Sequence, residues 1–539
     1  MSPTAPRPAS EVDPSFDPLR DRVFVNGHVV TLDEERPTAS ALAVRGGRIL
    51  AVGGHDEVLA AAGRDAERVD LAGRTLLPGF HDAHVHLTMH GFSLTQVPLG
   101  GTRSLAEAVA RVRARAAELP LGRWIVGNGF ALQRWGTRSP DRAALDEAAP
   151  DHPVLLRSQD HHSGLANARA LQEATVGADT PDPAGGTFER RADGTPSGLL
   201  LERAVDRVAG AMPEPMPAAF EEALRAGGRH LASLGVTTVH HMAYEPASHW
   251  RALAALASCE DFPVRVWACL PQERIEEARA IGVATGQGGR RFTVGGAKFF
   301  VDGALGSLSA WMDAPYGGTD STGIILDGPE ALRERVPLAI RAGLTPVAHA
   351  IGDAAVGALV DVLDDTAALW RAAGLRPRIE HAQHVRLGDV ARIGRLGLVA
   401  SMQPLHLTFD APTIRERLAD REDRAYPVRG LLDAGARVAF GSDTPVAPPD
   451  VIDSLRAAVT RRGMHDLVIA PQHAVTPEEA VWAYTRGAAA AIQREGTSGV
   501  LRRGADADLV AMTADPTRAL PDDLAVGFTA VGGRFTYRA

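Results

Sequence analysis

Lysine is almost absent from this sequence. Lys298 is the single lysine among 539 residues, and the other 56 basic side chains are arginine. Cysteine is nearly as rare, because only Cys259 and Cys269 are present, which excludes a disulfide framework and a cysteine-rich metal site. We expect both cysteines to be small buried side chains in a reducing compartment.

Long apolar runs are absent too. No segment reaches the ~18 apolar residues that a membrane-spanning helix needs, and the N-terminal stretch lacks the apolar core of a signal peptide. The formal net charge of −9 gives no sign of a basic surface for nucleic acid or for an anionic membrane. The sequence therefore predicts a cytoplasmic protein with no nucleic-acid or membrane partner.

Both ends of the chain have the alternating patterns and turns of β-structure. After a Pro- and Ser-rich tail over residues 1–20, which we expect to be disordered, the pairs Asn26-Gly27 and Gly46-Gly47 are strong hairpin signals. The last 40 residues show the same pattern. We therefore predict one discontinuous β-sandwich domain made from residues 21–77 and 496–539.

Between the two ends, short Val/Ile-rich runs alternate with stretches of helical period, which predicts a (β/α)₈ TIM-like barrel over residues 78–495. One gap of about 150 residues is too long for a loop, so we interpret residues 88–232 as an insertion over the barrel mouth. The eight expected strands are at 75–81, 235–241, 263–269, 293–300, 344–349, 377–381, 397–402 and 437–443.

Polar residues gather where these expected strands end, and in such barrels the active site lies at the C-terminal ends of the strands. The first run leads into "HDAHVH", in which His84 and His86 are two residues apart and share one face of a strand. Imidazoles and carboxylates at one end of a barrel are typical of a metal site. The later runs add His240 and His241, Lys298, His349, "EHAQH" at 380–384, and Asp443.

Lys298 lies inside the fourth expected strand, where an arginine could serve for a simple ion pair. Two reactions need the amine itself: formation of a Schiff base, or reaction with CO₂ to give a carbamate that bridges two metal ions. Burial beside cations would favour the neutral, reactive amine. The plain alternative is a surviving lysine that buries its stem and keeps its charge in water.

These residues together resemble the amidohydrolase superfamily, in its binuclear subtype with a carboxylated lysine, and the resemblance covers almost the whole chain. More narrowly, the chain looks like amidohydrolase family 3, the YtcJ-like branch that includes N-substituted formamide deformylase. D-aminoacylase relatives depend on a cysteine ligand, and neither cysteine of this chain sits in a suitable place. The matching stretches are "GRWIVGNGF", "SPDRAALDEAAPDHPVLLRSQDHHSGLANARAL", "DPAGGTFERRADGTPSGLLLERA", "GGAKFFVDGALGSLSAWM" and "HAIGDAAV".

The resemblance implies two Zn²⁺ ions per chain, with other divalent metals as alternatives, bridged by carboxylated Lys298. His84, His86 and Asp443 would hold one ion, and His349 and His381 the other. A bridging hydroxide would attack an amide or related C–N bond of an N-acyl or N-formyl amine, and Asp443 would take the proton and return it to the leaving nitrogen. Relatives of this kind also imply a homodimer.

The resemblance places His162 and Asn167, both in the insertion, over the metal site as substrate-binding residues. His162 would contact the substrate or polarise its carbonyl group, and the alternative is a hydrogen-bonded structural histidine. Trp311, in the Gly-rich loop after the lysine strand, is a candidate substrate-binding residue, with a core tryptophan as the alternative. We expect Asp82 to orient a metal-binding imidazole without contacting the ion itself. His384 competes with His381 as the sixth-strand ligand, and His240, His241 and His406 are candidate supporting or substrate groups.

Two other hypotheses remain open at this point. The same scaffold could carry a mononuclear metal-dependent deaminase or a decarboxylase, although similar deaminases have H-x-x-E on the fifth strand where this chain has "HAIGD". A catalytically inactive scaffold protein is the other hypothesis. It fits less well because all six expected ligand positions are filled.

Overall fold

The computed structural model describes residues 17, 20–137, 139–158, 163–183, 185–214, 216–243 and 247–539. The larger of its two compact units contains an eight-stranded parallel sheet in the order β21-β20-β19-β18-β17-β16-β15-β8, in which each strand pairs with the next barrel strand along the chain. A parallel bridge from Val85 to Thr444 brings the first strand next to the last. The strands are β8 (Phe80–Val85), β15 (Val236–His241), β16 (Arg265–Pro271), β17 (Phe292–Phe300), β18 (Pro346–Ala350), β19 (Arg378–His381), β20 (Val399–Met402) and β21 (Arg437–Phe440).

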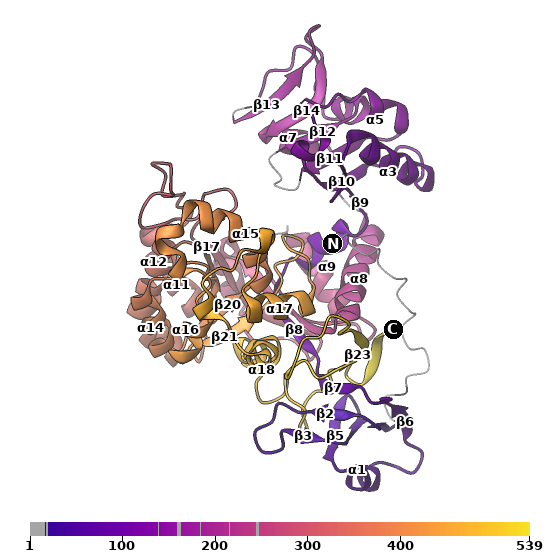
Figure 1. The fold of residues 1–539 in the computed structure, drawn as a ribbon, viewed down its shortest axis with the longest axis vertical. Coiled ribbons are helices and arrows are strands. Elements are labelled where there is room, and N and C mark those ends of the chain that lie inside the picture. Colours follow the sequence, from indigo (N-terminus) through magenta and orange to yellow (C-terminus); the bar gives the residue numbers. More distant parts are fainter. Residues whose placement is uncertain are drawn as a thin grey trace. The chain divides into compact units, whose positions relative to one another are not determined.

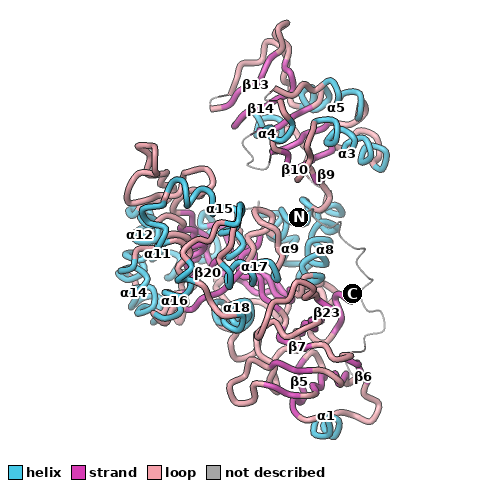
Figure 2. Tube along the Cα trace, viewed as in Figure 1, coloured by secondary structure: helices cyan, strands magenta, loops and turns pink. Residues whose placement is uncertain are grey.

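Helices follow the barrel strands and cover the outside of this sheet, as Figures 1 and 2 show. The predicted (β/α)₈ barrel is therefore confirmed. The helices are α9 (Ala247–Ala257), α10 (Ile275–Ala280), α11 (Pro329–Arg341), α12 (Asp353–Asp365), α13 (Ala367–Ala372), α14 (Leu387–Leu396), α15 (Pro404–Arg417), α16 (Val428–Asp433), α17 (Val451–Thr460), α18 (Pro477–Trp482) and α19 (Ala488–Ala491).

The expected first strand, 75–81, is wrong in its placement. It spans two strands, because β7 (Thr75–Pro78) belongs to a different sheet and the barrel strand β8 begins at Phe80. Gly79 separates them and passes so close to Thr237 that an added Cβ atom would lie 2.2 Å from its side chain. The sharp passage between two sheets needs this glycine, and the apolar pattern runs straight through it.

The two ends of the chain form two further sheets, which gives the predicted sandwich built from both termini. One has the order β5-β4-β1-β6, and the other has the order β24-β23-β22-β7-β2-β3, so N-terminal and C-terminal strands lie side by side (Figure 1). Phe24, Leu76, Leu509 and Phe528 belong to the apolar core of this region. The strands are β1 (Arg22–Val25), β2 (His28–Val30), β3 (Thr38–Ala39), β4 (Ala41–Arg45), β5 (Arg48–Gly53), β6 (Glu67–Asp70), β22 (Leu509–Met512), β23 (Val526–Val531) and β24 (Arg534–Arg538), with helix α1 (His55–Ala61).

The two expected hairpin signals have different outcomes. Gly46-Gly47 joins β4 to β5, which pair antiparallel, so this hairpin is confirmed. Asn26-Gly27 connects β1 to β2, but these strands lie in different sheets, so the turn carries the chain from one sheet to the other. A turn signal fixes the local chain reversal and leaves open which strands pair afterwards.

The long insertion folds as a compact unit of its own, over Gly91–Ala223. Its sheet has the order β13-β14-β12-β11-β10-β9. The expected location over the barrel mouth stays a prediction. The elements of this segment are β9 (Val97–Pro98), α3 (Leu105–Glu118), β10 (Ile125–Phe130), α4 (Leu132–Trp135), α5 (Ala143–Ala148), β11 (Val154–Ser158), β12 (Ser163–Ala166), α6 (Ala168–Glu173), β13 (Gly186–Arg190), β14 (Pro196–Glu202) and α7 (Arg203–Ala209), with α2 (Leu87–Ser93) and α8 (Pro217–Ser233) at its borders.

Two statements about absences complete the fold. Within the described ranges, no helix is both long enough and apolar enough to cross a membrane. Both cysteines are free thiols, and Cys269 on β16 is buried as expected. Cys259 is exposed, so its expected burial is wrong. It follows helix α9 in the connection to β16, where the apolar pattern of the sequence is weak.

Candidate metal centre

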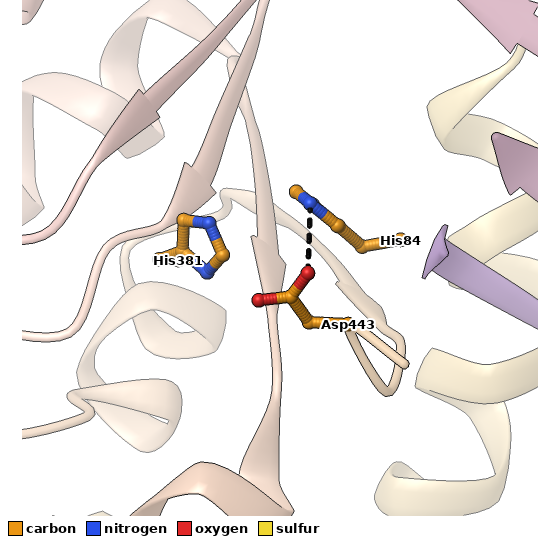
Figure 3. A group of neighbouring side chains, drawn as sticks. All are labelled: His84, His381 and Asp443. Atoms are coloured by element: carbon orange, nitrogen blue, oxygen red, sulfur yellow. Dashed lines mark ion pairs between the residues drawn. The ribbon is translucent and has the colours of Figure 1, made fainter. Parts of the chain in front are cut away.

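Three expected ligands meet at the C-terminal end of the barrel. His84 comes from β8, His381 is the last residue of β19, and Asp443 follows β21 (Figure 3). Each offers a ligand atom, and these atoms all lie within 4.8 Å of one another. His84 Nε2 is 3.4 Å from Asp443 Oδ1. All three side chains are buried, so the charged carboxylate needs a compensating partner.

His86 lies beside this group, as the shared strand face requires. Its Nε2 is 3.2 Å from Asp443 Oδ1, and its ring centroid is 5.6 Å from that of His84. Burial alone would raise the pKa of Asp443, but His84 and the hydrogen bond from His86 hold it well below the ordinary value of 3.8. The carboxylate is therefore ionised and is shared between two imidazoles.

Lys298 on β17 is buried at the same end of the barrel. Its Nζ has no hydrogen-bond partner in the described part of the chain and lies 4.3 Å from the centroid of the Phe300 ring. Burial lowers the pKa of this amine from 10.5 to about 8, against the opposing charge of Glu380. A buried amine without a partner is costly unless another group completes the site.

His349 extends the cluster on the other side of His381, because the two ring centroids are 4.5 Å apart. Its Nε2 is 3.0 Å from the carbonyl oxygen of Gly303, which assigns the proton to Nε2. The unprotonated Nδ1 is then the nitrogen that is free to bind a metal ion. His381 is fixed in the opposite sense. Its Nδ1 lies 2.7 Å from Gln403 Oε1, so Nε2 is the atom left free.

His84 is fixed by a carboxylate that the sequence reasoning missed. Its Nδ1 is 2.8 Å from Glu380 Oε2, and Glu380 also accepts hydrogen bonds from Arg378. Glu380 and Arg378 are both fully buried inside the barrel. His84, His349 and His381 thus each bond to the protein through one nitrogen and keep the other for an ion, the arrangement that orients metal ligands in proteins.

The protonation states of the rings also suit a metal. Burial is the largest cause that lowers the pKa of His84 to about 4, and it holds the pKa of His381 well below 6.5. Both imidazoles are therefore neutral at pH 7, which is the form that binds metal ions. The residues present fit a divalent-metal site with nitrogen and oxygen ligands.

Asp82 contacts His84 through the backbone. Its Oδ1 accepts hydrogen bonds from the backbone N–H groups of His84 and Ser442, at 3.2 and 2.8 Å. No hydrogen bond from an imidazole to Asp82 is found in the described residues, so any orienting effect on His84 acts through its backbone and not through its ring. Burial raises the pKa of Asp82 to about 7. It ties the end of β8 to the end of β21 and positions His84 through the backbone.

Backbone conformation explains how neighbouring residues face the same site. Side chains alternate along a strand, so Glu380 and His381 should point to opposite faces of β19. His381 has φ = 76° and Asp443 has φ = 61°, both in the left-handed region that side chains other than glycine rarely adopt. The turn in the backbone at the end of β19 brings His381 to the site although Glu380 already faces the barrel interior. Such strain is common at functional sites.

Asp302, just after β17, organises the loop next to His349 and was also missed. Its carboxylate accepts hydrogen bonds from the backbone N–H groups of Trp311, Ile351 and Gly352, at 2.9, 3.0 and 2.8 Å. Gly352 packs so tightly that an added Cβ atom would lie 2.0 Å from the Trp311 carbonyl oxygen. Trp311 is half-buried there, so it stays a candidate substrate contact near His349.

The remaining expected residues divide into three groups. His162 lies outside the described residues. His384 is buried, and the structure brings His381 rather than His384 together with His84 and Asp443. His240 and His241 make structural hydrogen bonds, His240 with Arg378 and His241 with the backbone N–H of Leu87.

Asn167 belongs to the insertion, and its side-chain amide makes all of its hydrogen bonds to neighbouring backbone groups. Its side-chain oxygen accepts hydrogen bonds from the backbone N–H groups of Val154 and Ala170, and its amide nitrogen donates to the carbonyl oxygens of Ala149 and His152. These four bonds exhaust the capacity of an amide group. The expected role of Asn167 in substrate binding is therefore replaced by a structural one, as the N-cap of α6.

Comparison with known proteins connects this geometry to a family. The model of an amidohydrolase family matches residues 67–537. Protein LONG AFTER FAR-RED 3 of Arabidopsis thaliana is 32% identical over 542 residues, which cover 96% of this chain and 92% of the relative. N-substituted formamide deformylase of Arthrobacter pascens is 28% identical over 524 residues, covering 92% and 94% of the two chains.

A solved structure supports the same assignment. An uncharacterized metal-dependent hydrolase from Pyrococcus furiosus is 28% identical and superimposes with a TM-score of 0.78 over 92% of this chain and 100% of its own. The predicted resemblance to amidohydrolase family 3 and the predicted fold class are confirmed by these matches.

Proposed function

Because the chain belongs to the amidohydrolase family and its fold is that of metal-dependent hydrolases, we propose that it hydrolyses an amide or related C–N bond of a small N-acyl or N-formyl amine. The observation that carries the proposal is the meeting of His84, His381 and Asp443 beside an unpaired, buried Lys298. A buried amine with a lowered pKa, next to ionised and metal-binding groups, is what carbamate formation requires.

The residues divide naturally between two ions. His84, His86 and Asp443 would hold one divalent ion, and His349 and His381 would hold the other. Carboxylated Lys298 would connect them, since its Nζ has no other partner in the described residues. The proposed metal is Zn²⁺, which accepts this mixture of imidazole and carboxylate ligands.

Bound metal ions would supply Lewis-acid chemistry, by making a water molecule acidic and by polarising the substrate carbonyl group. Asp443 would move the proton. Its pKa is held well below 3.8, so the carboxylate is ready to accept a proton at neutral pH and to deliver it to the leaving nitrogen. Glu380 keeps His84 in one orientation through this step, because its carboxylate accepts the ring N–H.

The substrate class rests on the relative from Arthrobacter pascens, whose name states activity on N-substituted formamides. A formyl group is the smallest acyl group, so a formamide panel tests the chemistry with the least demand on pocket shape. We propose N-alkyl and N-aryl formamides as the first substrates, with the corresponding acetamides as the comparison for acyl size.

Metal content per chain tests the proposed centre, measured by elemental analysis after expression with bicarbonate. We expect about two ions in the wild type and a sharp loss in Lys298→Arg, since guanidinium cannot form the carbamate. Lys298→Ala supplied with acetate is the matched variant, because a free carboxylate can take the place of the missing carbamate and restore metal binding. One tightly held ion in the wild type and in Lys298→Arg would refute the bridging role.

A mononuclear deaminase or decarboxylase is the second candidate, and one observation favours it. The ligand atoms of His84, His381 and Asp443 are close enough to hold a single ion between them. In that case the wild type would contain one ion, Lys298→Arg would keep it, and hydrolysis of the formamide panel would be absent. Release of ammonia or CO₂ from the substrate would then identify the reaction.

A further inference from the structure

His406 lies at the edge of the candidate centre and has no part in the metal set described above. It is in the first turn of α15, which directly follows the seventh barrel strand, β20. Its ring is stacked nearly parallel to that of His381, with centroids 6.2 Å apart and an interplanar angle of 18°. Its Nε2 is 3.8 Å from Asp443 Oδ2, beyond hydrogen-bond distance.

The other nitrogen of this ring is held from behind. Gln383 Nε2 lies 3.3 Å from His406 Nδ1, and an amide nitrogen can only donate a hydrogen bond. His406 Nδ1 is therefore the acceptor, which puts the proton of the neutral ring on Nε2. The Gln383 side chain is buried.

The Nε2–H group of His406 has nothing to bond to in the described part of the chain, although the atom is buried. The rings of His84, His349 and His381 differ in this respect, because each directs an N–H group to a protein acceptor. A buried donor without an acceptor is costly in a folded protein.

Two other residues, on the same helix and on a later loop, connect to Gln383. The carboxylate of Asp410, one turn along α15, accepts a hydrogen bond from the hydroxyl group of Tyr426. The backbone N–H of Tyr426 in turn donates to the carbonyl oxygen of Gln383. His406 is thus set in a connected framework, as a preorganised donor requires.

We propose that His406 is a further catalytic residue of the proposed hydrolase, and that its Nε2–H donates a hydrogen bond to the acyl oxygen of the substrate beside Asp443. Gln383 is its positioning residue, which fixes the tautomer. The inference rests on the proposed function, because an acyl oxygen in the site presupposes amide hydrolysis. The bond strengthens as negative charge develops on that oxygen, so it acts on the rate more than on substrate binding.

The tautomer is tested by NMR on the metal-containing wild-type protein with ¹⁵N-labelled histidine. We expect His406, assigned from the signal missing in His406→Phe, to have a protonated Nε2 and an unprotonated Nδ1 at pH 8. Gln383→Leu should lose this single tautomer and show a mixture. A proton on Nδ1, or protons on both nitrogens, in the wild type would overturn the proposal, and this result does not depend on any activity.

Kinetics on the formamide panel tests the catalytic role. His406→Phe keeps the ring and removes the donor, and we expect kcat to fall about 10²- to 10³-fold with KM nearly unchanged. His406→Gln should recover part of the loss, because its amide still donates. The matched control is His55→Phe, the same exchange at an exposed position on α1, which should leave kcat and KM unchanged.

Metal content separates the outcomes. We expect His406→Phe to keep the metal content of the wild type, which shows that the lost rate comes from the donor and not from a lost ion. A kcat within about threefold of the wild type in metal-loaded His406→Phe would overturn this inference and leave the proposed function standing. A wild type that hydrolyses no amide in the panel would overturn both.

Discussion

Glu380 offers the most demanding test of how the site is built. It lies fully buried between His84 and Arg378, and the exchange Glu380→Gln keeps its shape while removing its charge. The exchange leaves Arg378 as a buried cation without its partner carboxylate. The exchange also weakens the hydrogen bond to His84. A glutamine side chain can face the His84 N–H with its oxygen, which accepts, or with its NH₂ group, which cannot. We expect loss of stability and loss of metal affinity together.

The magnitude follows from the pKa of this group. Burial alone would raise it, but Arg378 and the hydrogen bond from His84 lower the pKa of Glu380 from 4.5 to about 2. A difference of this size corresponds to about 3 kcal/mol in the free energy of unfolding. Breaking a buried ion pair by removing one partner typically costs about 3 to 5 kcal/mol, which agrees with that value.

The pH dependence has a definite sign. Because the folded-state pKa lies below the ordinary value, the contribution of Glu380 is complete above pH 4.5 and is lost as the pH falls towards about 2. The stability gap between the wild type and Glu380→Gln should therefore stay constant from pH 8 to pH 5. It should narrow below pH 4.5, where the wild-type carboxylate begins to take up protons.

Urea unfolding of both metal-free proteins, followed by tryptophan fluorescence at several pH values, measures this gap. Glu276→Gln serves as the control, because its ion pair with Arg279 is exposed and should leave the unfolding curve unchanged. In the metal-containing proteins we expect metal affinity to fall about 10- to 100-fold in Glu380→Gln. A gap below about 1 kcal/mol at pH 7, or a gap that widens on acidification, would refute the reasoning.

Two further predictions concern other parts of the chain. Ellman's reagent should react with one thiol in the native protein and with two in urea. The reason is that Cys259 is exposed, whereas Cys269 is buried with its pKa raised to about 12. Two fast-reacting thiols in the native state would contradict this prediction. Asn167→Ala should lower the stability of the insertion by about 1 to 3 kcal/mol, because it removes the hydrogen bonds of the side chain. Limited proteolysis should therefore cut the insertion faster, while metal content stays at the wild-type level. Unchanged proteolysis together with reduced activity would contradict the structural role and indicate that Asn167 binds substrate.

The sequence could predict what depends on strand pattern and side-chain type. Seven of the eight expected barrel runs overlap the observed strands closely, since apolar runs between helical stretches leave little choice of fold. His84 and His86 are predictable from their spacing together with their place at a strand end and the matching ligands on later strands, because a strand places residues i and i+2 on one face. Lys298 stands out because it is the single lysine of the chain. The apolar pattern of its strand alone would not have marked it as a functional residue.

The supporting residues could not be predicted in the same way. Asp82 is close to the H-x-H pair in sequence and is the residue that the sequence offers to orient a ligand imidazole, whereas Glu380, almost 300 residues from His84, makes the hydrogen bond to the His84 ring. Hydrogen bonds across a barrel join strands that are far apart in the chain, and their register is set by packing. Asp302 was missed for a related reason, because its partners are backbone N–H groups, which every residue has.

His381 shows how far the alternation rule extends. On a regular strand, Glu380 facing the barrel interior would turn His381 outwards to the helices, and the sixth ligand would be lost. The structure avoids this with positive φ angles at His381 and the next residue, Ala382, at 76° and 44°. Each non-glycine residue in this conformation costs about 1 kcal/mol or more, so the strand end is strained. The strain is offset by two results on one short strand: an acceptor for the ring of His84 and, directly after it, a ligand for the same centre.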